Sequence, residues 1–104
     1  MKNIILVYIT NPTRAEARKI AKFLLQKKLI ACANIFPIES LYQWKNKIAQ
    51  EKEFVLLAKT TADQLKNIKK EVEKIHSYSI PCAIEIPARA NKKYFDWLIT
   101  SLAA

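Results

Sequence analysis

The order in which strand-like and helix-like apolar patterns alternate restricts the fold of this chain more than any other feature. Residues 4–9 form a continuous, largely β-branched run, which predicts a first strand buried on both faces. After it, Thr13 and Glu16 stand at capping-box spacing, and apolar residues recur with helical period as far as Lys28. The chain is therefore expected to begin with a strand followed by a helix.

The middle third of the sequence predicts a long hairpin. Residues 30–44 have the pattern of a strand, interrupted by Pro37, which cannot donate a ladder hydrogen bond and so indicates a bulge or an edge strand. Residues 45–47 form the natural reversal, and residues 53–59 are expected to run back as the third strand. Arms of about fifteen residues at ~3.3 Å per residue would reach about 50 Å, beyond the edge of a small domain.

The second half adds a helix and a strand. Thr61 and Gln64 repeat the capping-box spacing, and an apolar stripe then continues to a predicted helix end near His76. Residues 83–86 alternate in the manner of a fourth strand, which we expect Pro87 to close.

A last short helix completes the pattern. Asn91 is a suitable capping residue, and Tyr94, Trp97 and Leu98 would then share one face. The order βαββαβ plus a terminal helix permits few topologies when crossovers are right-handed. The simplest is a single α+β domain over residues 1–104, a ferredoxin-like βαββαβ sandwich with a long hairpin between the second and third strands and a C-terminal helix. Its first and third strands would be central, and its helices would cover only one sheet face, so the other face needs a partner.

The sequence contains no glycine, which limits how the backbone can turn. Positions with positive φ must then be filled by asparagine or avoided, because asparagine tolerates the left-handed region better than most residues. Asn11, Asn46 and Asn91 are the candidates for such positions.

Charge and cysteine content restrict the partners and the compartment. The net charge of +9 would favour nucleic acid, but the lysines are scattered over predicted helix faces, which is typical of solvated surface. No apolar run approaches the ~20 residues of a membrane span, and residues 1–3 lead into the first strand without a signal-peptide pattern. We expect a cytoplasmic protein without nucleic-acid or membrane partners, in which Cys32 and Cys82 stay reduced.

Several blocks in the right order resemble the CutA divalent-cation tolerance family along nearly the whole chain. The most specific block is residues 30–35 followed by Pro37, Ser40, Tyr42 and Trp44; the others are residues 56–61, residues 76–81, which are similar to His-Pro-Tyr-Glu-x-Pro, and residues 94–98, which are similar to Tyr-x-x-Trp-Leu. The resemblance implies one CutA-like domain, a homotrimer whose long hairpins pair with neighbours, a role in tolerance of copper and other divalent ions, and an architectural likeness to the PII signalling proteins.

The sequence departs from the family pattern at several positions. Asn46 replaces the usual glycine after the hairpin tryptophan, and Ser79 replaces the motif glutamate. Members to which copper ligands are assigned carry a cysteine at the end of strand one and paired histidines before the Pro-Tyr, but here those positions hold Ile9 and Ile75, and only His76 remains. The resemblance therefore implies no required cofactor and, at most, a weakly bound divalent cation such as copper.

Two residues are candidate metal ligands, each with a structural alternative. His76 could bind a metal, but a histidine at a helix C-terminus can equally bond the last carbonyls of that helix. Cys32 could do the same, although a thiol in an apolar strand usually packs as a small hydrophobe.

Two further groups of residues are candidates for a cleft and an interface. Strand ends and loops carry the polar groups of a candidate ligand cleft between subunits, namely Lys59, Tyr78, Glu39 and Ser40. The hairpin carries aromatic residues that are expected at the trimer interface rather than in a base-stacking platform, namely Tyr42, Trp44 and Phe54.

The residues do not suggest catalysis. The chain has one histidine, no glycine-rich phosphate loop and no carboxylate pair at acid-base or metal spacing. The first hypothesis is a trimeric, non-catalytic divalent-metal (copper) tolerance protein of the CutA type. The alternative is a PII-like signalling protein that binds a small anionic ligand in the inter-subunit cleft through Lys59, and a purely structural interaction module is the third reading.

Overall fold

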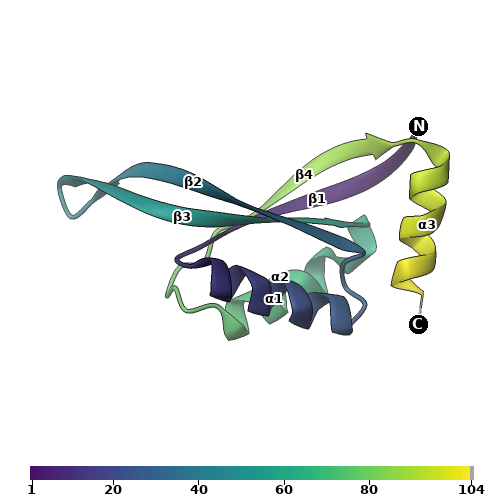
Figure 1. Ribbon diagram of the computed structural model, residues 1–104, viewed down its shortest axis with the longest axis horizontal. Coiled ribbons are helices and arrows are strands. Elements are labelled where there is room, and N and C mark those ends of the chain that lie inside the picture. Colours follow the sequence, from purple (N-terminus) through teal and green to yellow (C-terminus); the bar gives the residue numbers. More distant parts are fainter. Residues whose placement is uncertain (104) are drawn as a thin grey trace.

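The computed structural model describes residues 1–103 and contains the predicted elements in the predicted order (Figure 1). The elements are β1 (Lys2–Asn11), α1 (Arg14–Gln26), β2 (Cys32–Trp44), β3 (Lys47–Thr60), a 3₁₀ turn (Ala62–Gln64), α2 (Leu65–Ile75), β4 (Ala83–Ala90) and α3 (Lys92–Leu102). The four strands form one antiparallel sheet in the order β2-β3-β1-β4, with β1 and β3 in the centre. This is the ferredoxin-like arrangement expected from the sequence.

The main core lies between the sheet and the helices α1 and α2, which both lie on one side of it (Figure 1). Alternate residues of β1 point into this core because side chains on a strand alternate between its two faces. They meet apolar residues from β3 and both helices, and the central members are Ile5, Val7, Ile9, Ile20, Leu24, Leu56, Ile68 and Val72. The intervening residues Ile4 and Leu6 pack with Leu98 of α3, so the N-terminal part of β1 is covered on both faces, as predicted.

The sheet face turned away from α1 and α2, here called the open face, keeps large apolar side chains in solvent. Phe36 on β2 and Ile84 and Ile86 on β4 belong to it by register and are exposed, Ile84 to 50%. An exposed apolar surface of this kind on a small domain usually marks a contact with another molecule.

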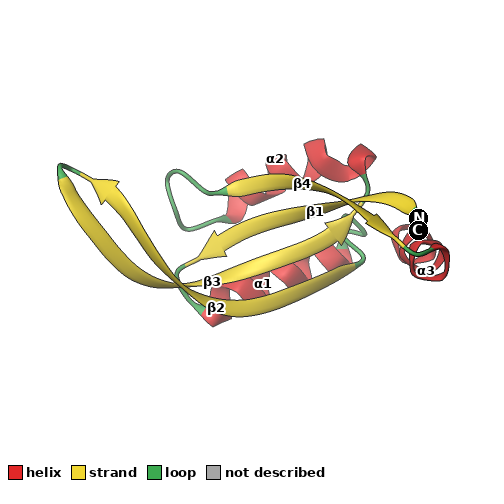
Figure 2. Cartoon of the chain, turned by 90° about the horizontal axis from the view of Figure 1, so that it is seen from above, coloured by secondary structure: helices red, strands yellow, loops and turns green. Residues whose placement is uncertain are grey.

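The hairpin of β2 and β3 extends beyond α1 and α2 and forms one end of the molecule along its 46 Å long axis (Figures 1 and 2). Pairing is continuous from Cys32 opposite Lys59 to Trp44 opposite Lys47, without a bulge. Of the two alternatives for Pro37, the edge position is therefore the correct one, because β2 is an outer strand. The turn uses positive φ at Lys45 and Asn46, of 50° and 63°. The expectation for Asn46 is thus confirmed.

Other details differ from the sequence prediction. The third strand begins at Lys47 rather than at residue 53, because the tight turn lets pairing start at once. Pro87 lies inside β4 instead of closing it, since β4 is also an edge strand and the missing N–H breaks no ladder there. Asn11 and Asn91 do not have positive φ, whereas Lys28 does, at 60°, just after α1.

The helix starts also differ from each other. Thr13 caps α1 as predicted, its Oγ1 accepting the Glu16 N–H at 3.1 Å. Thr61 makes no such cap, because its hydroxyl bonds Asp63 and a 3₁₀ turn precedes α2. In α3, Leu98 is buried but Trp97 is largely exposed, so the predicted shared face is only partly buried.

Candidate functional site

His76 lies where the loop after α2 meets the end of β1, and both of its ring nitrogens are engaged. Nε2 lies 2.8 Å from the carbonyl oxygen of Thr10, which can only accept, so Nε2 carries the proton. Nδ1 accepts the backbone N–H of Tyr78 at 3.0 Å. The ring is fully buried, and Nδ1 is also 3.4 Å from Glu16 Oε2. The geometry fits the neutral tautomer with its proton on Nε2, holding the loop 76–82 against β1.

Glu16 reinforces the same loop from α1. In a complete capping box its carboxylate would turn back to the backbone N–H of Thr13. It instead accepts from Ser77, whose Oγ and backbone N–H lie 2.8 and 3.2 Å from Oε2. The sequence prediction therefore holds for the threonine half of the box, while the glutamate half serves the loop.

Two tyrosine–glutamate pairs stand next to this loop. The Tyr78 hydroxyl donates to Glu53 Oε2 at 2.7 Å, and the Tyr42 hydroxyl donates to Glu51 Oε1 at 2.6 Å. Because residues two apart on a strand share a face, Glu51 and Glu53 both project on the same side of β3. Glu53 is only 8% exposed, and a buried carboxylate needs a donor of this kind.

The pairs hold both phenols in their protonated form. Burial, followed by the hydrogen bond to Glu53, raises the pKa of Tyr78 far above its ordinary value. The hydrogen bond to Glu51 raises the pKa of Tyr42. Both tyrosines therefore act as hydrogen-bond donors to the carboxylates.

A cavity of about 510 Å³ opens beside the two pairs, between the hairpin and the loop 76–82. We call it the tyrosine–glutamate cavity, and it is lined by Thr10, Tyr42, Trp44, Glu51, Glu53, Tyr78, Ser79, Ile80 and Cys82. Its walls combine carboxylates with aromatic rings and contain no lysine or arginine. Sequence reasoning found Tyr42, Trp44 and Tyr78 but missed Glu51, Glu53 and Cys82.

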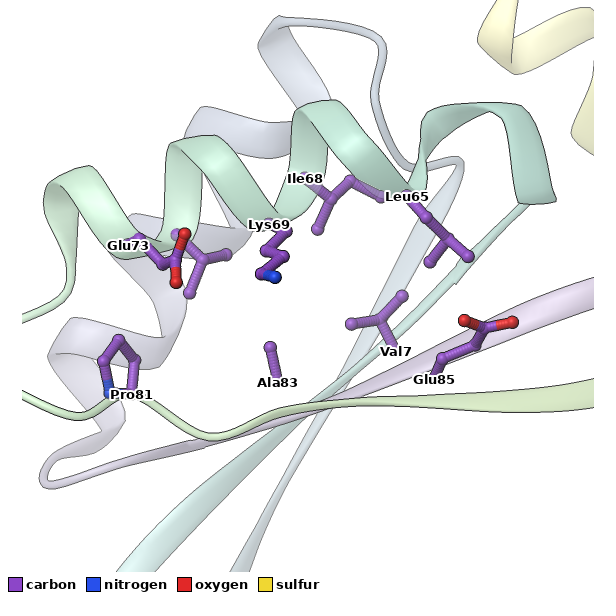
Figure 3. Close-up of a pocket in the computed structure, with 9 residues that line it drawn as sticks. Val7, Leu65, Ile68, Lys69, Glu73, Pro81, Ala83 and Glu85 are labelled. Atoms are coloured by element: carbon purple, nitrogen blue, oxygen red, sulfur yellow. The ribbon is translucent and has the colours of Figure 1, made fainter.

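A second cavity, of about 190 Å³, lies between α2 and β4 (Figure 3). Its lining includes the aliphatic side chains of Val7 from β1 and Ile68 from α2, and Lys69 points from α2 toward Ala83. It contains none of the site residues expected from the sequence.

One chain does not assemble the expected cleft. Lys59 stands opposite Cys32 at the other end of the sheet, with its Nζ 5.2 Å from the Tyr94 ring centroid. It lies six residues along β3 from Glu53, about 20 Å at the rise of a strand. Lys59 and Cys32 are therefore remote from Tyr78 and His76 within a single chain.

The remaining cleft candidates lie on opposite faces of the hairpin. Ser40 is opposite Glu51 and shares its face, next to the tyrosine–glutamate cavity. Glu39 points the other way and accepts a hydrogen bond from Gln50 at 3.0 Å. Glu39 is therefore not part of this cavity, because one step along a strand reverses the direction of the side chain.

The aromatic residues expected at an interface also divide between the two faces. Tyr42 and Trp44 share a face, and Trp44 is 54% exposed. Phe54 is on the opposite face, half-buried beneath the Arg14 guanidinium at 4.8 Å. Phe54 therefore does not share a surface with Tyr42 and Trp44 in the single chain, because one step along a strand reverses the side chain; that all three lie at the trimer interface stays a prediction.

Metal-binding chemistry is sparse in residues 1–103. No group of three or more histidine, cysteine, aspartate and glutamate side chains in this range is arranged to hold a metal ion. The two cysteines, Cys32 and Cys82, are free thiols, as expected.

No helix in the described part of the chain is both long and apolar enough to cross a membrane.

Comparison with known proteins places this fold. The model of the CutA1 divalent ion tolerance protein family matches residues 5–101. The chain belongs to this family. A divalent-cation tolerance protein CutA from Archaeoglobus fulgidus is 45% identical over 93 residues, covering 88% of this chain and 91% of the relative. The corresponding protein from Thermus thermophilus is 39% identical over 94 residues, with coverage of 88% and 91%.

Solved CutA structures agree with this one over almost their whole length. The CutA structure from Archaeoglobus fulgidus, which is described as periplasmic, superposes with a TM-score of 0.93 at 42% identity and covers 96% of this chain and 99% of its own. CutA1 from Ehrlichia chaffeensis gives the same TM-score and identity, with coverage of 100% and 99%. The ferredoxin-like fold read from the sequence is therefore that of the CutA family.

The CutA positions to which the sequence resemblance assigned copper ligands belong to the core in this chain. Ile9 is completely buried, and Ile75 packs against the same cluster. Neither side chain offers a donor atom, and His76 uses both ring nitrogens within the chain. These three positions therefore offer no free donor atom to a metal ion within the single chain.

Proposed function

We propose that this chain is a non-catalytic divalent-cation tolerance protein of the CutA type that works as a homotrimer in the cytoplasm. The observation that carries the proposal is the match of residues 5–101 to the CutA1 family. The absence of a catalytic arrangement in the sequence supports a role in binding rather than in turnover. The compartment is a separate question, because a relative is described as periplasmic. Fractionation of the native host, with detection of this chain by antibody, tests it.

Two features support a trimer. The open face exposes apolar side chains, Ile84 and Ile86 among them, and the hairpin projects past the helices with Trp44 near its tip. Association would bury both features, since a protruding hairpin can lie across a neighbour's open face. Light scattering at micromolar protomer concentration tests this. A mass of three chains is expected, and a monomer would refute the proposal.

Copper binding by this chain is proposed to be weak. Copper(II) prefers several nitrogen or oxygen donors in tetragonal geometry, and Ile9 and Ile75 provide none. His76 would have to give up its bonds to Thr10 or Tyr78 to bind a metal. Calorimetric titration with copper is the test. Tight stoichiometric binding that His76→Ala abolishes would contradict the proposal.

The PII-like alternative has less support from the site. It requires Lys59 to meet an anion, whereas Lys59 Nζ lies over the Tyr94 ring, 5.2 Å from its centroid, and the cavity near Tyr78 is lined by carboxylates. A thermal-shift screen against metals and nucleotides separates the alternatives, because a ligand that prefers the native state raises its apparent stability. Stabilisation by nucleotides alone, lost in Lys59→Ala, would favour the alternative.

A further inference from the structure

We propose that the outer surface of α1 and α2 binds double-stranded DNA through its phosphate backbone, without preference for sequence. The exposed cations of the two helices define this surface, here called the basic helix layer: Arg14, Arg18, Lys19, Lys22, Lys66, Lys69, Lys70 and Lys74. Because α1 and α2 lie on the same side of the sheet (Figure 1), the fold gathers cations that look scattered along the sequence. Such binding goes beyond the proposed function, and it replaces the expectation that these lysines are merely solvated.

The carboxylates of the two helices do little to neutralise this layer. Glu16 accepts hydrogen bonds from the backbone N–H and the hydroxyl of Ser77, in the loop after α2. The Glu71 side chain is only 13% exposed, and its Oε1 lies 3.5 Å from Lys27 Nζ, just after α1. Glu73 is exposed but lines the small cavity between α2 and β4. The outward surface therefore carries a concentrated positive charge, which attracts a polyanion.

The lysines of α2 form a regular row. Lys66, Lys70 and Lys74 follow one another at intervals of four residues, so they share one side of the helix. Ile68 and Val72 alternate with them and are buried in the core, which places the lysine row on the outward side. At a rise of about 1.5 Å per residue, successive lysines are about 6 Å apart. Phosphates on one DNA strand follow at about 3.4 Å along the axis, so the row can meet alternate phosphates.

A second pair of lysines lies on α1. Lys19 and Lys22 are exposed and about one turn apart, whereas Ile20 and Leu24 of the same helix are buried in the core that α1 shares with α2. Neighbouring helices are about 8–10 Å apart, a distance between the widths of the minor and major grooves of B-DNA, about 6 and 12 Å. The lysines of α1 and α2 can therefore contact phosphates on the two strands that border one groove.

Two other polyanions fit the layer less well. Both helices lie wholly within the described residues, and Leu25, at 38%, is their one exposed large apolar side chain, whereas a membrane-binding helix presents several beside its cations. Single-stranded nucleic acid stacks its bases on aromatic rings. Phe23, the only aromatic residue of the two helices, is half-buried, with Lys27 Nζ 5.0 Å from its ring centroid. A duplex requires only cations at phosphate spacing.

The layer stays accessible in the proposed trimer. Assembly there uses the hairpin and the open face, and α1 and α2 lie on the opposite side of the sheet (Figures 1 and 2). A duplex can therefore reach the basic helix layer in the single chain and in the assembled protein alike.

The test is fluorescence anisotropy of a labelled duplex of about 20 base pairs, titrated with the full-length protein in its native assembly. Saturable binding is expected at about 50 mM NaCl. The logarithm of the binding constant should fall against the logarithm of the salt concentration with a slope of about −4.5, because each of the five outward lysines displaces about 0.9 counterions from the duplex. A single strand of the same sequence should bind about tenfold more weakly, since each contact displaces fewer counterions.

Lys66→Gln combined with Lys70→Gln removes two contacts of the row on α2. This double variant should bind the duplex at least about tenfold more weakly at the same salt concentration, with a slope shallower by about 1.8. Lys92→Gln combined with Lys93→Gln is the matched control, because it removes the same net charge from the exposed start of α3, outside the layer. Its affinity should stay within about threefold of the unmodified protein. Glutamine retains high helix propensity, so both variants should fold, and circular dichroism checks this.

Any of four results would overturn the proposal. One is the lack of saturable duplex binding at about 100 µM protomer. Another is an equal loss of affinity in the α2 variant and the α3 control, which would show that only net charge matters. Equal or tighter binding of the single strand would exclude recognition of a duplex. Cosedimentation with vesicles of phosphatidylglycerol and phosphatidylcholine, without duplex binding, would assign the layer to an anionic membrane.

Discussion

Replacing Tyr78 with phenylalanine tests whether burial gives the pair with Glu53 its importance. The substitution keeps the ring and removes only the hydroxyl, which donates to Glu53 Oε2 at 2.7 Å. Glu53 is only 8% exposed, so water has little access to replace that donor. Hydrogen bonds to charged groups contribute about 1.5–3 kcal/mol, so we expect the free energy of unfolding to fall by about 2 kcal/mol.

Tyr42→Phe is the internal control, because it removes the same chemical contact from an exposed position. Tyr42 donates to Glu51 at 2.6 Å, but both residues are in solvent and water can replace the lost hydroxyl. Its effect should be clearly smaller than that of Tyr78→Phe, because Tyr42 is exposed in the single chain. Urea unfolding of both variants at pH 7 and one protomer concentration is the assay, since assembly makes stability depend on concentration. Equal losses in the two variants would refute the argument from burial.

The same pair predicts a dependence on alkaline pH. The pKa of Tyr78 is raised in the folded state, while in the unfolded chain it takes its ordinary value of about 10. The unfolded state therefore loses its proton first, and the stabilisation is complete below pH 10 and declines as the pH rises above it. Tyr78→Phe should show a shallower decline above pH 10 than the unmodified protein. Identical slopes of unfolding free energy against pH in the two proteins would show that Tyr78 does not cause the loss of stability above pH 10.

Three further predictions concern assembly, metal affinity and backbone strain. Trp44→Ala should weaken the trimer by about 2 kcal/mol, because buried aromatic anchors dominate interfaces; light scattering on dilution measures it, and an unchanged trimer would place Trp44 at the rim. Ile9→Cys combined with Ile75→His should strengthen copper binding in calorimetry, whereas unchanged affinity would mean that these positions do not face a common site. Lys28→Gly should raise the free energy of unfolding by about 0.5–1 kcal/mol, because Lys28 has φ of 60°, and a lower melting temperature would contradict this.

Much of the fold was predictable because it depends on local spacing. The continuous apolar run of residues 4–9 predicted a strand covered on both faces, which agrees with the central position of β1, and Pro37 left a bulge or an edge strand as the alternatives for β2. The sequence predictions that were wrong concern positions whose conformation depends on tertiary contacts. Pro87 is tolerated inside β4 because that edge is unpaired in the chain, and Lys28 adopts a left-handed conformation that the helix end requires. Residue preference alone favoured asparagine at such positions and could not identify a lysine.

The sequence could have placed Glu51 and Glu53 on the cavity face if the third strand had been predicted at its full length. A two-residue turn at Lys45 and Asn46 fixes the register of the whole hairpin. Pairing starts with Trp44 opposite Lys47, and every further residue pair of β2 and β3 is set by that first pair. Extending the third strand back to that turn would have placed Glu51 on the face of Tyr42. Starting it at residue 53 left Glu51 outside any strand.

The contact between Tyr78 and Glu53 could not be predicted from strand register in the same way. Tyr78 lies 25 residues from Glu53 in sequence, on a loop with no repeating pattern. The path of that loop depends on His76, which joins the Thr10 carbonyl to the Tyr78 N–H through one tautomer, and on Glu16, which leaves its capping role to bind Ser77. Each residue had a plausible local use at a helix end. In the folded chain α1, β1 and the loop come together, and these contacts hold Tyr78 in place against Glu53. A substitution at Glu16 or His76 should therefore weaken the hydrogen bond between Tyr78 and Glu53, although neither residue contacts Glu53.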